Sequence, residues 1–280
     1  MAGYFAGIDI GSTTTKVVIV NNSGIVSSVI GPTGPEHRKL AVEVMQKALN
    51  EVNLPVEAMN YLVATGYGRI NVPFADKQIT EITCHAKGIN SIFPEAKTVI
   101  DIGGQDVKGI KISDRGRPVD FVMNDKCAAG TGRFLEVIAE VLGLSLGDMS
   151  AIAEESKSPA QISSFCTVFA AQEVSARLAE GVPLCDLAAG IYESVADRIL
   201  RIVSRLSVER EVVITGGGAK SANLVRIFSD KLGYDVLVPP EPLITGALGA
   251  ATLGRELFQA AGDQRGRITH RDLREVTFFS

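Results

Sequence analysis

The chain has 280 residues, of which 46% are hydrophobic and 21% are charged. This balance argues against a disordered or fibrous protein, and at about 150 residues per domain the length is nearly enough for two domains. The net charge of −4 disfavours nucleic acid as a partner, because phosphate-backbone binding depends on a basic surface. Charged residues interrupt every apolar stretch, so we expect no membrane span.

The N-terminal sequence and the cysteine usage favour a cytoplasmic protein. The first nine residues contain no basic residue ahead of an apolar run and end on an acidic one, which is unlike a secretory signal peptide. The four cysteines, Cys84, Cys127, Cys166 and Cys185, lie far apart. A disulfide framework is not expected in such a chain, so the cysteines are either buried core thiols or metal ligands.

The first predicted elements are a hairpin, a helix and a strand. Residues 5–11 and 17–20 are apolar strands on either side of a polar turn at 12–16. Apolar residues four positions apart predict a helix over 36–52, and a strand follows at 61–64.

The hairpin pattern recurs in the second part of the chain. Asp9-Ile10-Gly11 and Asp101-Ile102-Gly103 each lie between apolar strands, and a lysine follows each aspartate after seven positions. A repeat of this kind predicts a duplicated α/β domain.

The remaining predicted elements lie in the second half of the chain, and the domain boundaries follow from them. Strands are expected at 119–123, 211–214 and 235–238, and helices near Cys127, near Cys166, over 186–207 and after Gly216-Gly217-Gly218. The predicted domains are a first lobe at 1–95, with a helix at about 246–260 packing back on it, a second lobe at 96–245 and a tail at 261–280.

Two turns rich in glycine and hydroxyl residues are candidate phosphate-binding loops. Such turns expose backbone N–H groups to phosphate oxygens, whereas a Walker-type Gly-x4-Gly-Lys-Ser/Thr sequence does not occur in the chain. We interpret Asp9 and Asp101 as turn residues that would hold Mg²⁺ through water, and Lys16 as an added positive charge. The glycines at 216–218 would let the backbone approach a ligand closely.

At these residues the sequence resembles the superfamily of acetate and sugar kinases, heat-shock chaperones and actin. The resemblance implies an α/β fold, namely a duplicated actin-like ATPase fold with two lobes around a nucleotide cleft. It is sharper for the ATP-dependent activators of (R)-2-hydroxyacyl-CoA dehydratases, a group that also contains the benzoyl-CoA reductase ATPase subunits. Three strings carry it: Ala64-Thr65-Gly66-Tyr67-Gly68-Arg69, Asp101-Ile102-Gly103-Gly104-Gln105-Asp106, and Asn124-Asp125-Lys126-Cys127-Ala128-Ala129-Gly130-Thr131-Gly132-Arg133-Phe134.

The activator resemblance implies an oxygen-sensitive homodimer that hydrolyses ATP and passes one low-potential electron to a dehydratase or a related reductase component. Ferredoxin or flavodoxin would be the electron source. One [4Fe-4S] cluster per homodimer would be held by Cys127 and Cys166 of each chain. From spacing alone the core-thiol interpretation of both stays open. Cys84 and Cys185 are interpreted as core thiols, and His85 as a packing or capping residue.

The same resemblance assigns roles in ATP binding. The first phosphate loop comprises Asp9, Gly11, Ser12, Thr13 and Lys16, the second comprises Asp101, Gly103, Gly104 and Gln105, and adenosine is assigned to Gly216, Gly217, Gly218 and Gly246. Either Gln105 or Asp106 would orient the attacking water, and the sequence does not distinguish them.

Several alternative functions stay open at this point. A benzoyl-CoA reductase ATPase subunit and a reductase of double-cubane cluster proteins lie within the same group. A small-molecule kinase of the same fold would phosphorylate a sugar or carboxylate, and its cysteines would be incidental. A chaperone-like nucleotide-binding module would lack redox chemistry.

Overall fold

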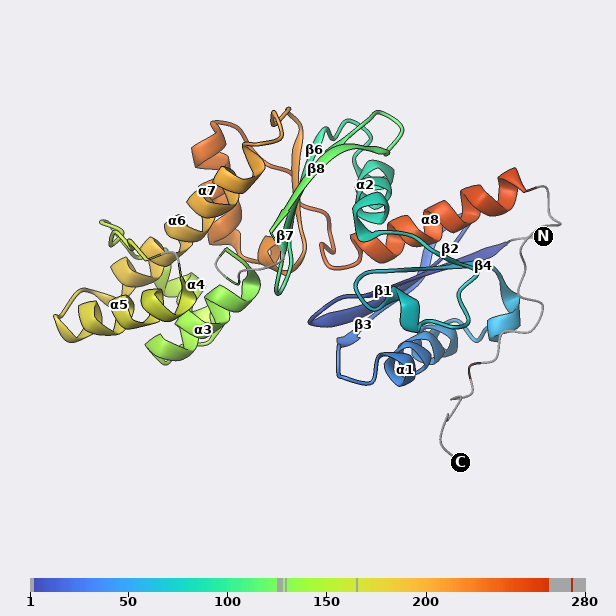
Figure 1. Ribbon diagram of the computed structural model, residues 1–280, viewed down its shortest axis with the longest axis horizontal. Coiled ribbons are helices and arrows are strands. Elements are labelled where there is room, and N and C mark those ends of the chain that lie inside the picture. Colours follow the sequence, from blue (N-terminus) through green and yellow to red (C-terminus); the bar gives the residue numbers. More distant parts are fainter. Residues whose placement is uncertain (1–2, 125–127, 129, 165, 262–272, 274–280) are drawn as a thin grey trace. The chain divides into compact units, whose positions relative to one another are not determined.

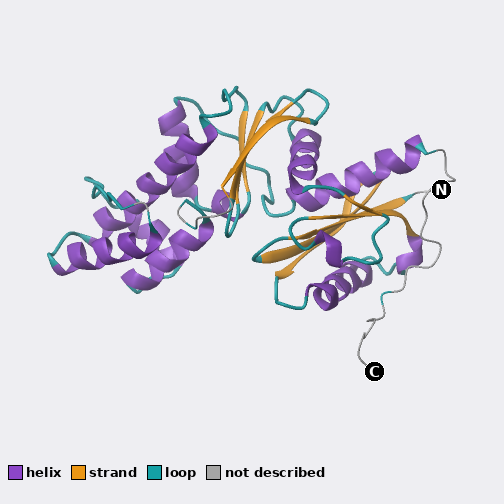
Figure 2. Cartoon of the chain, in the orientation of Figure 1, coloured by secondary structure: helices purple, strands orange, loops and turns teal. Residues whose placement is uncertain are grey.

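The computed structural model describes residues 3–124, 128, 130–164, 166–261 and 273 of the chain (Figure 1). They form two compact units. Unit 1 is Met1–Glu95, Ile112–Pro118 and Leu243–Ser280, and unit 2 is Ala96–Lys111 and Val119–Pro242. Each unit combines helices with its own β-sheet (Figure 2). No helix in the described ranges has the length and hydropathy of a membrane span.

Unit 1 is built on a five-stranded sheet in the order β3-β2-β1-β4-β5. Its elements are β1 (Tyr4–Ile10), β2 (Thr14–Asn21), β3 (Gly24–Pro32), α1 (His37–Glu51), β4 (Met59–Thr65), β5 (Lys77–Gln78), α2 (Glu81–Ile92) and α8 (Thr245–Ala260), with short 3-10 helices at Val56–Ala58 and Arg69–Asn71. β1 is antiparallel to β2 and parallel to β4. Strands β1 and β2 are buried almost throughout, because helices cover both faces of the sheet.

The two faces of the unit 1 sheet carry separate apolar clusters. Ile8 and Ile10 pack with Met45 of α1 on one face, while Phe5 packs with residues of α8 on the other, so α1 and α8 lie on opposite sides of the sheet (Figure 1). Gly7 allows the second contact, because a Cβ atom there would collide with the backbone of α8.

Helices α2 and α8 pack closely through small residues. A Cβ atom on Gly88 of α2 would collide with the Thr245 carbonyl, and one on Gly249 of α8 would collide with the Cys84 carbonyl. The small residues at these positions therefore allow the backbones of the two helices to approach closely.

Unit 2 repeats the strand plan of unit 1 in a four-stranded sheet ordered β8-β7-β6-β9. Its elements are β6 (Thr98–Ile102), β7 (Val107–Ile112), β8 (Pro118–Asn124), α3 (Gly132–Leu142), α4 (Leu146–Ala153), α5 (Thr167–Ala179), α6 (Leu184–Val203), β9 (Val212–Thr215), the 3-10 helix η3 (Gly217–Lys220) and α7 (Ala222–Leu232). β6 is antiparallel to β7 and parallel to β9. This arrangement matches β1 with β2 and β4, which confirms the predicted duplication.

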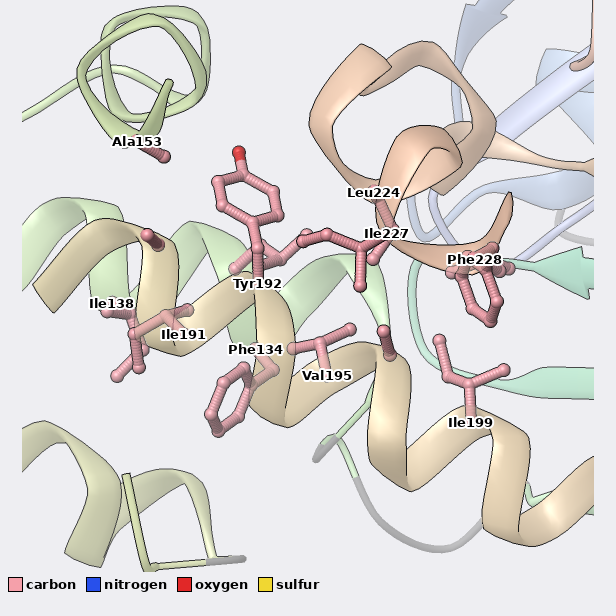
Figure 3. Close-up of a cluster of buried hydrophobic side chains, with 14 of the residues drawn as sticks. Phe134, Ile138, Ala153, Ile191, Tyr192, Val195, Ile199, Leu224, Ile227 and Phe228 are labelled. Atoms are coloured by element: carbon pink, nitrogen blue, oxygen red, sulfur yellow. The ribbon is translucent and has the colours of Figure 1, made fainter. Parts of the chain in front are cut away.

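The helices of unit 2 enclose a large apolar core (Figure 3). Ile199 of α6 points toward Phe228 of α7, while Tyr192 of α6 points toward Ala153 of α4 and Leu224 of α7 (Figure 3). Phe134 of α3 belongs to the same cluster, and both Tyr192 and Phe228 are almost completely buried. α6 therefore serves as the central helix around which α3, α4, α5 and α7 pack.

Three predictions about individual elements are wrong. α3 begins at Gly132 rather than near Cys127, and the expected strand at 235–238 is a single bridge between Val213 and Leu237. The long helix ends at Val203 rather than at 207. The helix expected after the glycines at 216–218 is α7, and the 3-10 turn η3 precedes it. β3, α2 and α4 were not predicted.

Candidate functional site

The first hairpin loop is shorter than predicted, because β2 already begins at Thr14. Asp9 and Lys16 are paired residues of β1 and β2 rather than turn residues. Their exposed fractions are only 4% and 9%, and the Lys16 Nζ lies 3.2 Å from the Asp9 carboxylate. The interpretation of Asp9 as a turn residue is therefore wrong. Gly11, Ser12 and Thr13 form the turn itself.

The second hairpin repeats this pair and adds a carboxylate. Asp101 is paired with Lys108 across β6 and β7, and the Lys108 Nζ lies 3.3 Å from the Asp101 carboxylate. Lys108 also forms a close ion pair with Asp106. All three side chains are buried, so Asp101 too is a strand residue rather than a turn residue.

Gln105 and Asp106, the two candidate water-orienting residues of the second loop, differ in their exposure to solvent. Asp106 is 4% exposed, paired with Lys108, and its carboxylate lies against Gly103 inside the turn. The Gly103 N–H donates a 2.9 Å hydrogen bond to the Asp106 carbonyl, which closes the turn. Gln105 is exposed. Of the two, the structure leaves Gln105 as the side chain with access to solvent.

A glycine faces the carboxylate of each strand aspartate. Gly66, with φ +82°, follows β4, and Gly216, with φ +79°, follows β9. A Cβ atom on Gly66 would collide with Asp9, and one on Gly216 would collide with Asp101. Positive φ and close approach both require glycine at these two positions.

The glycine string of unit 2 therefore has a counterpart in unit 1. Two residues after each of these glycines comes another, Gly68 or Gly218, and each packs in the same way on the isoleucine next to its aspartate, Ile10 or Ile102. The assignment of only Gly216, Gly217 and Gly218 to a ligand missed Gly66 and Gly68. The sequence signal was Thr-Gly-x-Gly directly after a strand, which occurs at 65–68 and at 215–218.

Gly246 lies in the Asp9 surroundings of unit 1. A Cβ atom there would lie 3.1 Å from the Asp9 carboxylate and 3.2 Å from the His85 Nε2. His85 is buried, and its Nδ1 lies 3.0 Å from the Thr245 hydroxyl, as predicted for a packing histidine. The four glycines assigned to adenosine are thus divided, with Gly246 in unit 1 and the other three in unit 2.

The three described cysteines differ in accessibility. Cys84 is fully buried, and burial raises the pKa of its thiol to about 12, which confirms a core thiol. Cys185 is only half-buried, so the core-thiol prediction is wrong for it. Cys166 is exposed and occupies the N-cap position of α5. Cys127 lies outside the described residues. Within those residues, no group of three or more His, Cys, Asp or Glu side chains could hold a metal ion.

Cys166 directly precedes a helix of 13 residues, and the positive end of the helix dipole lies at that end of the helix. Two apolar side chains follow it, Val168 and Phe169, and each is 62% exposed. An accessible thiol in such surroundings has the chemistry of a soft metal ligand.

The chain is similar along most of its length to two activators of acyl-CoA dehydratases. It is 46% identical over 262 residues to an activator of lactoyl-CoA dehydratase from Anaerotignum propionicum, which covers 91% of this chain and 99% of that protein. It is 45% identical over 254 residues to a 2-hydroxyisocaproyl-CoA dehydratase activator from Clostridioides difficile, covering 89% and 93%.

Solved structures agree with these relatives. The activator of the 2-hydroxyisocaproyl-CoA dehydratase from Clostridium difficile with bound ADPNP superimposes with a TM-score of 0.86 at 42% identity, covering 95% of this chain and 99% of that one. A glucokinase from Streptomyces griseus matches over 91% of this chain and all of that one, with a TM-score of 0.58 at 12% identity, which shows the shared actin-like ATPase fold alone. A family model matches residues 6–254, and the chain belongs to the BadF/BadG/BcrA/BcrD ATPase family.

Proposed function

We propose that this ATPase activates a 2-hydroxyacyl-CoA dehydratase by transferring one electron at low potential. The observation that carries this proposal is the exposed Cys166 thiol at the start of α5, in a chain that is 46% identical to a dehydratase activator. In a kinase of this fold the same thiol would be incidental. Hydrolysis of ATP would supply the free energy for the transfer.

The two hairpins provide the groups that ATP hydrolysis requires. We propose that Gly11, Ser12 and Thr13 of the first loop and Gly103 and Gly104 of the second bind the phosphates through N–H groups and hydroxyls. The Asp9 and Asp101 carboxylates would hold Mg²⁺ through water. Lys16 and Lys108 form ion pairs with these carboxylates, which offsets part of the cost of burying their charge. Gln105 would orient the attacking water, and Gly216, Gly217, Gly218 and Gly246 would face adenosine.

The iron–sulfur site is proposed from donor chemistry. Cys166 offers an accessible thiol at a helix N-terminus, and Cys127 is the second proposed ligand. Four thiolates hold a [4Fe-4S] cluster, which supplies one-electron redox chemistry when bound. Two ligands per chain therefore require a homodimer with the site on its two-fold axis.

The partners of this reaction follow from the same proposal. A 2-hydroxyacyl-CoA dehydratase would accept the electron, and ferredoxin or flavodoxin would supply it. A cytoplasmic location remains a prediction. Benzoyl-CoA reductase and double-cubane cluster proteins are alternative acceptors, and a small-molecule kinase is the alternative from another class.

Anaerobic purification tests the proposal. We expect a brown protein with about four iron atoms per dimer, ATPase activity, and ATP-dependent activation of an added dehydratase when a reductant is present. A colourless protein that phosphorylates a sugar or a carboxylate instead would refute the proposal in favour of the kinase.

A further inference from the structure

Glu173 of α5 binds the segment that precedes Cys166. Its carboxylate accepts hydrogen bonds from the Ser163 N–H at 3.1 and 3.2 Å, the Ser163 hydroxyl at 3.0 Å and the Ser164 N–H at 2.9 Å. Arg177, one turn further along the helix, forms an ion pair with it at 3.2 Å. One side chain of α5 therefore binds two consecutive residues just ahead of the helix.

The position of Glu173 defines the path of this segment. Glu173 is seven positions after Cys166, which corresponds to about 10 Å along an α-helix. Ser163 and Ser164 must therefore lie alongside the first two turns of α5, although the helix begins only at Thr167.

The segment is also anchored further upstream, on α6. The Ala160 N–H donates a 2.8 Å hydrogen bond to the Asp186 carbonyl, a Cβ atom on Gly190 would collide with the Ala160 backbone, and Ile162 is buried in the core of unit 2. These contacts involve Ala160 and Ile162. From Ser163 onward, the described hydrogen bonds of the segment go to Glu173.

We propose that Glu173 is a positioning residue for Cys166: by binding Ser163 and Ser164 to α5, it fixes the thiol at the start of that helix. This inference rests on the proposed function, because it takes Cys166 as a cluster ligand. Glu173 would not touch the cluster itself. Residues that orient a metal ligand from the second layer commonly change metal affinity by about 10- to 100-fold when they are mutated.

The ionisation of Glu173 supports this role. Partial burial alone would raise the pKa of the carboxyl, but the hydrogen bonds from Ser163 and Ser164 outweigh it, and the pKa lies below its ordinary value. The group is thus a carboxylate at neutral pH. Hydrogen bonds to an ionised acceptor are shorter and stronger than neutral ones, which suits a residue that must hold a segment in place.

Two measurements on the variants Glu173→Gln and Glu173→Ala test the inference. Glu180→Ala is the matched control, because Glu180 is an exposed residue at the end of the same helix. The first measurement is hydrogen exchange of the Ser163 and Ser164 amides in the iron-free full-length protein. The second is the rate of iron loss to a chelator from the anaerobic holoprotein. We expect faster exchange, and iron loss about 10- to 100-fold faster in Glu173→Ala, with Glu173→Gln in between and Glu180→Ala unchanged.

The outcomes separate this inference from the proposed function. A wild-type protein that binds no iron would refute the proposed function, and the exchange measurement would still decide whether Glu173 holds the segment. A wild-type protein that binds a cluster, together with variants that lose iron at the wild-type rate, would overturn the positioning role. Unchanged exchange in Glu173→Ala would overturn it as well.

Discussion

Asp9 and Asp101 occupy equivalent positions in the two units. Each is 4% exposed, each lies directly opposite a lysine on the antiparallel neighbouring strand, and each faces a glycine of positive φ. Both units therefore retain a buried ion pair and the glycine that faces it. Packing alone does not require this arrangement, because apolar residues would fill the same space without the cost of burying charge.

The first prediction concerns the charge of these aspartates. Asp9→Ala removes the ion-pair partner of the buried Lys16 and should lower the free energy of unfolding by about 3–5 kcal/mol. Asp101→Ala leaves Lys108 paired with Asp106, so we expect a smaller loss of stability. Asp9→Asn and Asp101→Asn keep the shape and a hydrogen-bond acceptor, so we expect a smaller loss of stability but an equal loss of Mg-ATP hydrolysis. Thermal unfolding and an ATPase assay measure the two effects.

Asp230→Asn is the control for this pair of variants, because Asp230 forms an exposed ion pair with Arg226. Exposed pairs contribute only about 0–1 kcal/mol, so both stability and activity should stay near wild type. Full ATPase activity in a folded Asp9→Asn or Asp101→Asn protein would show that the aspartates do not serve ATP hydrolysis.

The second prediction separates backbone strain from close approach at Gly216. Gly233 has the same φ of +79°, but a Cβ atom there would meet no neighbouring atom. Gly233→Ala should therefore cost only the left-handed backbone, about 1–2 kcal/mol. Gly216→Ala adds a collision with Asp101 and should cost about 1–3 kcal/mol more, with a loss of ATPase activity that Gly233→Ala lacks. Equal unfolding free energies would mean that the space beside Asp101 relaxes without cost.

How far the sequence alone predicts this fold depends on where the partners of a residue lie. Asp-Ile-Gly between apolar runs predicts both hairpins, because the signal is local. The turn was extended to Lys16 because Thr14, Thr15 and Lys16 are polar. Their partners are distant in sequence: Thr15 lies 2.9 Å from the Thr33 hydroxyl, and Lys16 pairs with Asp9. Local patterning cannot show that a polar residue is satisfied inside a sheet.

In the candidate site, too, the contacts between residues distant in sequence could not be predicted from local patterns. The lysine seven residues after each aspartate was noticed as a repeat, yet only its three-dimensional pairing identifies Lys108 as the partner of two carboxylates. Helix α4 was missed although it has a local signal, since the Ser145 hydroxyl caps it by accepting a hydrogen bond from the Asp148 N–H. The equivalence of Gly66 with Gly216 was missed because Tyr67 interrupts what is a run of three glycines in unit 2.

The third prediction distinguishes Gln105 from Asp106. Gln105 is exposed, so Gln105→Ala should leave the unfolding free energy within about 0.5 kcal/mol of wild type while lowering kcat for ATP hydrolysis. Asp106→Asn weakens a buried ion pair with Lys108 and should lower stability instead. Kinetics and denaturant unfolding of both variants test this assignment, and a Gln105→Ala enzyme with wild-type kcat would contradict it.

The last prediction concerns the reactivity of two thiols that differ in accessibility, the buried Cys84 and the exposed Cys166. Alkylation requires the thiolate. Burial raises the pKa of Cys84 from 9.0 to about 12, so at pH 8 this buried thiol is both protonated and inaccessible. Cys166 is exposed at a helix N-terminus. In the iron-free native protein we therefore expect iodoacetamide to modify Cys166 and not Cys84, as resolved by peptide mass spectrometry.

The raised pKa of Cys84 also makes the stability of the protein depend on pH. Because the folded state holds its proton more tightly than the unfolded state, the contribution of Cys84 is fully present below pH 9 and is lost as the pH rises toward 12. Cys84→Ser should accordingly flatten the decline of unfolding free energy above pH 9. Modification of Cys84 at pH 8 at the rate of Cys166 would contradict its place in the core between α2 and α8.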